Sequence, residues 1–155
     1  MKIKLLSADA KIPTRADKGA AGLDLYLPKT VTIKPGRQVV PLDFAMALDY
    51  GNEGQIRPRS GFSAKGIEGY PCSNAICKET KRYDADVLLG TIDCTYRGNV
   101  GAIIKSYEKE PFVVPAGTRI AQMVISECSM EGFEQVDELD ETDRGEGGFG
   151  HTGSK

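Results

Sequence analysis

The chain has little net charge, no long apolar run and no long helical pattern, and each absence excludes a class of protein. Its 155 residues carry a formal net charge of −2, so we expect no strong electrostatic preference for nucleic-acid polymers or anionic membranes. The apolar runs are far too short to cross a bilayer, and the N-terminal residues lack the apolar core of a signal peptide. We therefore expect no membrane association and a cytoplasmic protein (in the host cytoplasm if the source is viral).

Cysteine and histidine are also scarce. Four cysteines, Cys72, Cys77, Cys94 and Cys128, accompany a single histidine, His151. Nothing suggests secretion, and the chain is longer than typical disulfide scaffolds, so a disulfide framework is not expected. Cys72, Cys77 and His151 could be zinc ligands, but a second cysteine pair is missing. Free thiols are the favoured interpretation.

What the chain does contain is turn chemistry every eight to twelve residues, with short β-prone segments between the turns. Leu23, Leu25 and Leu27 alternate with Asp24 and Tyr26, which is the two-residue period of a half-buried strand. The pattern predicts an all-β, single-domain fold, a sandwich, jelly roll or small barrel. The strands are expected at Lys2–Leu6, Leu23–Leu27, Val31–Lys34, Gln38–Leu42, Phe44–Leu48, Gln55–Pro58, Val87–Asp93, Val100–Tyr107, Phe112–Val114 and Arg119–Ser126.

One helical turn is predicted over residues 59–66. Ser60 is a favourable N-cap residue, and Gly66 is a favourable stop. A helix N-terminus offers free N–H donors and a partial positive charge, which suit a phosphate group near Arg59 and Ser60. An ordinary capped helix without a ligand is the alternative.

The segment 90–98 is the best candidate for chemistry. It is expected to form a strand, a tight turn at Tyr96–Gly98 and a returning strand, with Asp93 near the turn. A carboxylate beside a phosphate site can orient and deprotonate water. The alternative is an aspartate that accepts hydrogen bonds from turn amides.

The last twelve residues, 144–155, contain five glycines, one arginine and one aromatic residue. Ordering glycine-rich backbone is costly, so this tail is not expected to settle on its own domain. Arg144 can clamp a phosphate, and Phe149 offers a flat face for a base. The tail is therefore expected to be either a flexible lid over a nucleotide or a disordered terminus.

Five segments together resemble the motifs of one family, the trimeric deoxyuridine triphosphate nucleotidohydrolases (dUTPases). In order, they span residues 20–26, 58–65, 90–98, 117–122 and 144–153. The resemblance implies a jelly-roll-like β-barrel subunit over 1–143, with one short helix and a flexible arm over 144–155. It also implies a homotrimer with shared active sites, Mg²⁺, and hydrolysis of dUTP to dUMP and pyrophosphate. That reaction limits uracil in DNA and supplies dUMP for thymidylate synthesis.

The same resemblance implies a role for each site residue. Asp93 would be the base that activates water for attack on the α-phosphate. The backbone of Thr91, Ile92 and Asp93 would recognise uracil, and Tyr96 would pack on the deoxyribose. Arg59, Ser60, Gly61 and Gln122 would bind the phosphates, and Asp24 would hold the water shell of the metal. Arg144, Phe149 and Gly150 in the tail of a neighbouring subunit would close the site.

Three departures from the family pattern stand out. Val87 replaces a frequent asparagine on the expected wall of the uracil pocket, and His151 replaces a small hydroxyl residue in the tail. Residues 68–86 are longer than the short loop expected there. They are interpreted either as a plain surface loop or as an element that binds a protein partner, similar to bacteriophage members of the family.

Two other functions stay open at this point. The first is deamination of dCTP, alone or combined with hydrolysis, because the same fold supports it. The second is a nucleotide-dependent regulatory protein that binds its partner through residues 68–86.

Overall fold

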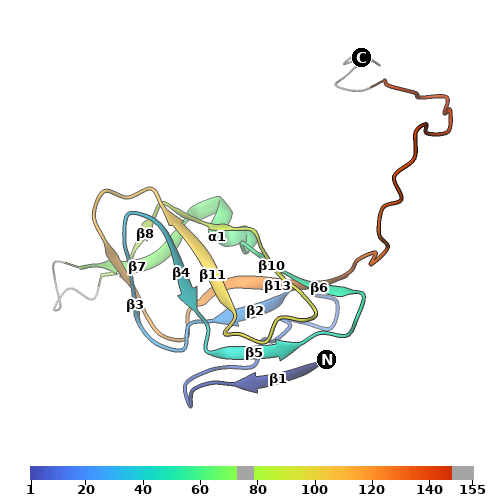
Figure 1. Cartoon of the computed structure of the whole chain (residues 1–155). Coiled ribbons are helices and arrows are strands. Elements are labelled where there is room, and N and C mark those ends of the chain that lie inside the picture. The colour runs from blue at the N-terminus through green and yellow to red at the C-terminus, as the bar shows by residue number, and fades with distance from the viewer. Residues whose placement is uncertain (73–78, 148–155) are drawn as a thin grey trace.

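A computed structural model of the chain describes residues 1–72 and 79–147. The described residues up to Glu127 form a body of β-strands with one short helix at its surface, and the segment after β13 leads away from that body (Figure 1). The elements are β1 (Lys2–Leu5), β2 (Leu23–Tyr26), β3 (Val31–Ile33), β4 (Gly36–Pro41), β5 (Phe44–Ala47), β6 (Asn52–Arg57), α1 (Ser60–Lys65), β7 (Ile67–Pro71), β8 (Lys81–Tyr83), β9 (Ala85–Leu88), β10 (Gly90–Ile92), β11 (Gly101–Ser106), β12 (Phe112–Val114) and β13 (Arg119–Glu127). The expectation of a jelly-roll-like, mostly β fold with one short helix is confirmed for the described residues.

All the strand pairs in the described residues are antiparallel, and they make four small sheets. The strand orders are β1-β5, β10-β6-β13-β2, β4-β11-β9 and β3-β12-β7-β8. The core lies between these sheets and contains Leu25, Phe44, Ile56, Ile104 and Phe112, each almost fully buried. Buried residues alternate with less buried ones in β9 and β11, which is the two-residue period of strands that bury one face.

The predicted strand over residues 87–93 is two strands in the structure. β9 pairs with β11, whereas β10 pairs with β6 in a different sheet. Leu89 lies between them and is 75% exposed. The chain therefore changes sheets at Leu89, and the continuous apolar run Val87–Leu89 concealed that change. β10 and β11 lie in different sheets, so the expected hairpin around residues 96–98 does not form.

The segment 68–86 contains strands at both ends rather than a plain surface loop. β7 pairs with β12 on one edge and with β8 on the other. Tyr83 is buried and stacks on Phe112, with ring centroids 4.1 Å apart. Ala85 is also buried, so this segment contributes to the core.

The N-cap of helix α1 lies one residue earlier than expected. Arg59, and not Ser60, is the N-cap residue, and its side chain makes no capping hydrogen bond. Gly66 ends the helix as predicted, and its N–H donates to the carbonyl oxygen of Phe62 at 2.8 Å. The arginine side chain is therefore free to turn toward another element.

Three of the cysteines, Cys72, Cys94 and Cys128, are free thiols, in agreement with the favoured interpretation. Cys77 lies outside the described residues. In residues 1–72 and 79–147, no helix has the length and apolar character that a membrane span needs.

We predict that Gly66→Ala destabilises the protein strongly. Gly66 has φ 71°, and a Cβ there would overlap the carbonyl oxygen of Tyr83. Backbone strain of this kind costs about 1–3 kcal/mol, and the overlap adds to it. Urea unfolding at fixed protein concentration measures the change in the free energy of unfolding.

Two glycines serve as controls for that measurement. Gly36 also has positive φ but nothing within 4 Å of an added Cβ, so Gly36→Ala reports backbone strain alone. Gly132→Ala meets neither obstacle. The loss in the free energy of unfolding is expected to be largest for Gly66→Ala, smaller for Gly36→Ala and smallest for Gly132→Ala. Equal stability of all three variants would contradict the prediction.

Candidate active site

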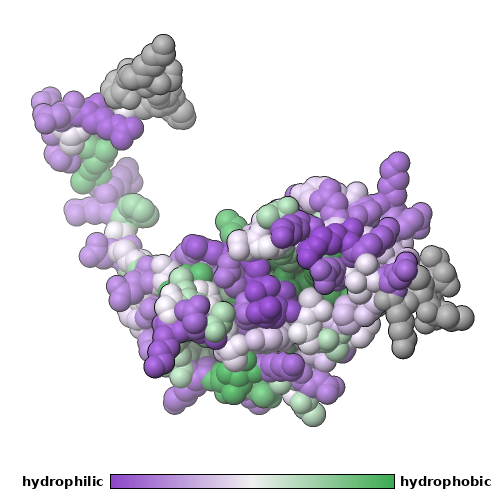
Figure 2. All heavy atoms as spheres, turned by 180° about the vertical axis from the view of Figure 1, so that it is seen from behind, coloured by the Kyte–Doolittle hydropathy of each residue, from purple (hydrophilic) through white to green (hydrophobic). Residues whose placement is uncertain are grey.

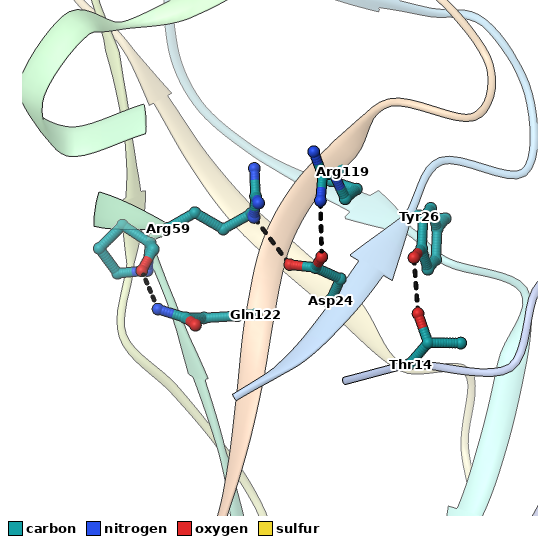
Figure 3. Close-up of polar contacts among 7 residues, drawn as sticks. Thr14, Asp24, Tyr26, Arg59, Arg119 and Gln122 are labelled. Carbon is teal, nitrogen blue, oxygen red and sulfur yellow. Dashed lines mark hydrogen bonds and ion pairs between the residues drawn. The ribbon is translucent and has the colours of Figure 1, made fainter. Parts of the chain in front are cut away.

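Asp24 is the centre of a charged cluster on the sheet β10-β6-β13-β2. It lies on β2 and is only 7% exposed. One of its carboxylate oxygens accepts a hydrogen bond from Arg59 Nε at 2.7 Å, and the other accepts one from Arg119 Nη1 at 3.1 Å. Figure 3 shows the two guanidinium groups side by side above the carboxylate. Two cations against one anion leave the cluster with a formal charge of +1, which favours an anionic ligand.

Gln122 lies beside this cluster, because it pairs with Asp24 on β2 and with Arg57 on β6. Its Nε2 donates to the carbonyl oxygen of Pro58 at 2.8 Å, which ties β13 to the start of the helix (Figure 3). A Cβ at Gly22 would overlap the Gln122 amide oxygen. Gly22 of the first motif therefore leaves the space that the Gln122 side chain of the fourth motif occupies.

The same arginines line an open groove of about 390 Å³ at the start of α1. Arg59 and Gly61 border it from the helix, and Thr118 and Arg119 border it from the other side. An added Cβ at Gly61 would meet nothing within 4 Å, so this backbone stands open toward solvent. Ser60 is exposed beside it. The second and fourth motifs thus meet at a cationic groove.

Asp93 follows directly after β10 and is exposed. Its backbone carbonyl accepts the Tyr96 N–H at 3.0 Å, which closes a turn. In the part of the chain that the structure describes, no hydrogen-bond donor reaches the Asp93 carboxylate. This aspartate therefore does not hold the turn through its side chain, and its oxygens are available to a ligand.

Tyr96 is held in place by its own turn. Its hydroxyl donates to the carbonyl oxygen of Asn99 at 3.1 Å, and the ring occupies the space that a Cβ on Gly98 would need. The side chain is 44% exposed. The third motif thus presents a fixed aromatic ring next to an unengaged carboxylate.

Strand β10 is the edge of its sheet in the described residues. The backbone of Thr91 pairs with Gln55 on β6, and Ile92 is buried against the core. On an edge strand, half of the N–H and C=O groups point away from the neighbouring strand. These groups can recognise the hydrogen-bonding edge of a flat ligand.

The two halves of the candidate site lie far apart in one chain. Ile92 pairs with Gly54, whereas Asp24 and Arg57 both pair with Gln122. Asp93 is therefore four residues and three strands away from Asp24, which is roughly 20 Å at about 3.3 Å per residue and 4.8 Å per strand. Asp93 and the Asp24 cluster therefore lie in separate regions of one chain.

Of the tail, the structure describes residues 144–147, whose hydrogen bonds are all local. After β13 the chain runs away from the body, and residues 129–146 are exposed (Figure 1). Arg144 closes a local turn by donating from Nε to the Gly147 carbonyl oxygen at 2.7 Å. Phe149, Gly150 and His151 lie outside the described residues. Val87 is buried in the core cluster.

The sequence interpretation missed Arg119. Arg119 lies within the fourth motif, but the residue pattern around it does not indicate that its side chain binds the Asp24 carboxylate together with Arg59. Metal ligands are also few: no three His, Cys, Asp or Glu side chains gather in residues 1–72 and 79–147, and Asp24 is the one buried carboxylate there. Such residues suit a Mg²⁺ ion that arrives on substrate phosphates and keeps most of its waters.

Comparisons with known proteins identify the family of the chain. A deoxyuridine 5'-triphosphate nucleotidohydrolase of Syntrophotalea carbinolica is 44% identical over 99% of this chain and 96% of its own length. The human mitochondrial enzyme of that name is 40% identical over 99% of this chain, which spans about half (54%) of the human protein.

Solved structures show the same likeness. A mutant dUTPase of Staphylococcus bacteriophage 80alpha with dUpNHpp matches 98% of this chain and 97% of its own, with TM-score 0.78 and 28% identity. A mutant dUTPase of phage phi11 of S. aureus, described with a structural Mg(II) ion, matches 89% of this chain and 97% of its own, with TM-score 0.72 and 25% identity. The model of the dUTPase family matches residues 8–82 and 78–153. The chain therefore belongs to the dUTPase family.

Proposed function

We propose that this protein hydrolyses dUTP to dUMP and pyrophosphate. The observation that carries the proposal is the pairing of two complementary half-sites in one fold. One is a cationic groove held together by Asp24, and the other is an unengaged Asp93 at the open edge of β10. The names of the relatives, all nucleotidohydrolases of deoxyuridine triphosphate, supply the substrate.

In the proposed reaction, the Asp93 carboxylate takes a proton from a water molecule while the oxygen of that water attacks the α-phosphorus. The bond between the α-phosphorus and the bridging oxygen breaks, and pyrophosphate leaves with that bond's electron pair. A carboxylate without an internal hydrogen-bond donor is available for this role. The products are dUMP and pyrophosphate.

Recognition of the base is assigned to the backbone of Thr91, Ile92 and Asp93. The uracil edge offers an N–H donor and carbonyl acceptors, which complement the C=O and N–H groups of an edge strand. Cytosine reverses part of this pattern, and each unpaired buried polar group costs about 1–3 kcal/mol. The fixed ring of Tyr96 would pack on the deoxyribose and exclude a 2′-hydroxyl.

The phosphates are assigned to Arg59, Ser60, Gly61 and Gln122, beside the cationic groove. Mg²⁺ bound to the substrate would neutralise part of the triphosphate's charge. Asp24, whose oxygens both face guanidinium groups, would hold a water of the metal rather than the ion itself.

The assembly we propose is the homotrimer with shared sites that the family resemblance implies. The separation of roughly 20 Å between the half-sites in one chain supports sharing of the site between subunits. The segment after β13 supports an assembly as well. Green apolar residues recur along it in Figure 2, and the exposed ones are Met130, Phe133, Val136 and Leu139. These four side chains recur at every third residue, and we propose that a neighbouring chain covers them.

A partner-binding role of residues 68–86 is a second candidate. A groove of about 850 Å³ lies beside this segment, lined by Pro71, Cys72, Lys81, Tyr83, Tyr107, Glu108, Lys109, Glu110 and Pro111. A pull-down from host extract with and without the segment tests this role. Deamination of dCTP is not favoured, since the named relatives are nucleotidohydrolases.

The cytoplasm, or the host cytoplasm for a viral source, is the compartment we propose. The human relative is described as mitochondrial, so family membership alone does not assign a compartment. Fractionation of cells that produce the protein checks the location.

The function is tested by measuring pyrophosphate release from dUTP, dTTP, dCTP and UTP with Mg²⁺, and from dUTP in excess EDTA. We expect fast release from dUTP alone and its loss in EDTA. Ammonia release from dCTP would indicate deamination instead. No release from dUTP by folded protein would overturn the proposal.

Asp93→Asn is expected to lower kcat by about 10²- to 10⁴-fold, the usual contribution of a general base. Asparagine has the same shape, so binding of a non-hydrolysable dUTP analogue should stay within a few-fold of wild type. Calorimetric titration and steady-state kinetics measure both. Near-wild-type kcat in a folded variant removes Asp93 from this role.

Tyr96→Ala is expected to lower the ratio of kcat/KM for dUTP over that for UTP. The ring would otherwise fill the space of a ribose 2′-hydroxyl, and it is held there by Asn99 and Gly98. An unchanged ratio places the sugar discrimination at another residue.

Deletion of residues 144–155 is expected to leave the melting temperature almost unchanged, because Arg144–Glu146 are exposed in the single chain. The same deletion should lower kcat/KM strongly, since the proposed lid excludes water only when it is closed. Calorimetry and kinetics on the truncated chain test both expectations, and full activity without the tail excludes a lid.

A further inference from the structure

Strand β13 contains an irregularity that redirects one side chain. Gln122 and Ala121 pair with Asp24 and Leu25 in regular succession, but the register then shifts by one residue, and Arg119 pairs with Tyr26. Regular pairing would put Ile120 opposite Tyr26. The extra residue is a β-bulge, a feature that often re-aims side chains next to active sites.

The bulge decides which side chain reaches the cluster. Asp24 and Tyr26 are two residues apart on a strand, so they lie on the same face. With the shift, Arg119 lies on this face and contacts Asp24, while Ile120 is fully buried in the core. Without it, the apolar side chain would face the groove and the arginine would face the core.

The contacts of Asp24 are divided evenly between its two arginines. Each carboxylate oxygen serves one guanidinium, and Arg59 uses only Nε. The terminal nitrogens of Arg59 are therefore left for another ligand, and both arginines line the same groove. A carboxylate fixed on one side by Arg119 cannot rotate freely to meet Arg59 through both of its oxygens.

We propose that Arg119 is a positioning residue of the triphosphate site that acts through Asp24 on Arg59. Arg119 occupies one Asp24 oxygen, so that the other holds Arg59 by Nε alone and leaves its terminal N–H groups for phosphate. This inference rests on the proposed function, because it names how one of the phosphate-binding side chains is oriented.

The first test is a kinetic double-mutant cycle with Arg119→Met, Arg59→Met and the double variant. Arg119→Met should raise KM for dUTP about tenfold, the effect of losing a charge-assisted hydrogen bond, and leave kcat within about threefold. If Arg119 acts through Arg59, the double variant should be little worse than Arg59→Met. Arg119→Lys should restore part of the loss, because it keeps the charge but not the guanidinium geometry.

Arg82→Met is the matched control. Arg82 lines the same groove but contacts Glu68 and the Gly66 carbonyl oxygen instead of Asp24. Its loss removes the same charge from the groove without touching the cluster. KM should therefore rise clearly less than in Arg119→Met, because the charge lost is the same but Asp24 keeps both of its arginines.

A second readout does not depend on activity. The Nε–H resonance of Arg59 in the unliganded protein should shift in Arg119→Met and stay in place in Arg82→Met. Additive kinetic losses in the double variant, or an Arg59 resonance that does not change in Arg119→Met, would overturn the inference. An inactive wild-type enzyme with a shifted resonance would contradict the proposed function and leave the coupling of the two arginines established.

Discussion

The site depends on one buried carboxylate that two arginines share. Asp24 is almost inaccessible to water, and a buried charge is tolerated only when it is paired and hydrogen-bonded. Arg59, the N-cap residue of α1, and Arg119 on β13 provide that pairing. Because the two guanidinium groups would otherwise repel one another, the carboxylate is also what allows both to stand at the rim of one groove. The first, second and fourth motifs are therefore a single electrostatic unit.

The third motif is a separate unit. Asp93 and Tyr96 belong to a turn that is stabilised by its own backbone and by Asn99, at the opposite corner of the same sheet. The antiparallel register that places Gln122 beside Asp24 is the register that keeps Asp93 roughly 20 Å from it. The proposed chemistry, which uses both units, therefore calls for groups from more than one copy of the chain, and the exposed apolar residues after β13 are candidates for the contact between copies.

Much of the fold could be predicted from the sequence, because its strands alternate and its turns are marked by glycine and proline. All ten expected strand regions contain strands, and the helix lies within residues 59–66. β7 and β8 were not predicted. In β8, the exposed Lys81 and Arg82 precede the buried Tyr83, so the charged residues obscure the strand pattern. The role of Arg119 was missed because a bulge, which has no signature in the residue pattern, decides which face it occupies.

The most direct test of the account is activity in oligomers mixed from Asp93→Asn and Arg59→Met chains. Each variant alone lacks one half of the site, whereas a mixed oligomer contains sites with an intact Asp93 from one chain and an intact Arg59 from another. The account predicts that mixing restores pyrophosphate release from dUTP, and that mixing either variant with the Asp93→Asn/Arg59→Met double variant does not. No restoration, with mixed oligomers confirmed by native mass spectrometry, would contradict a site shared between subunits.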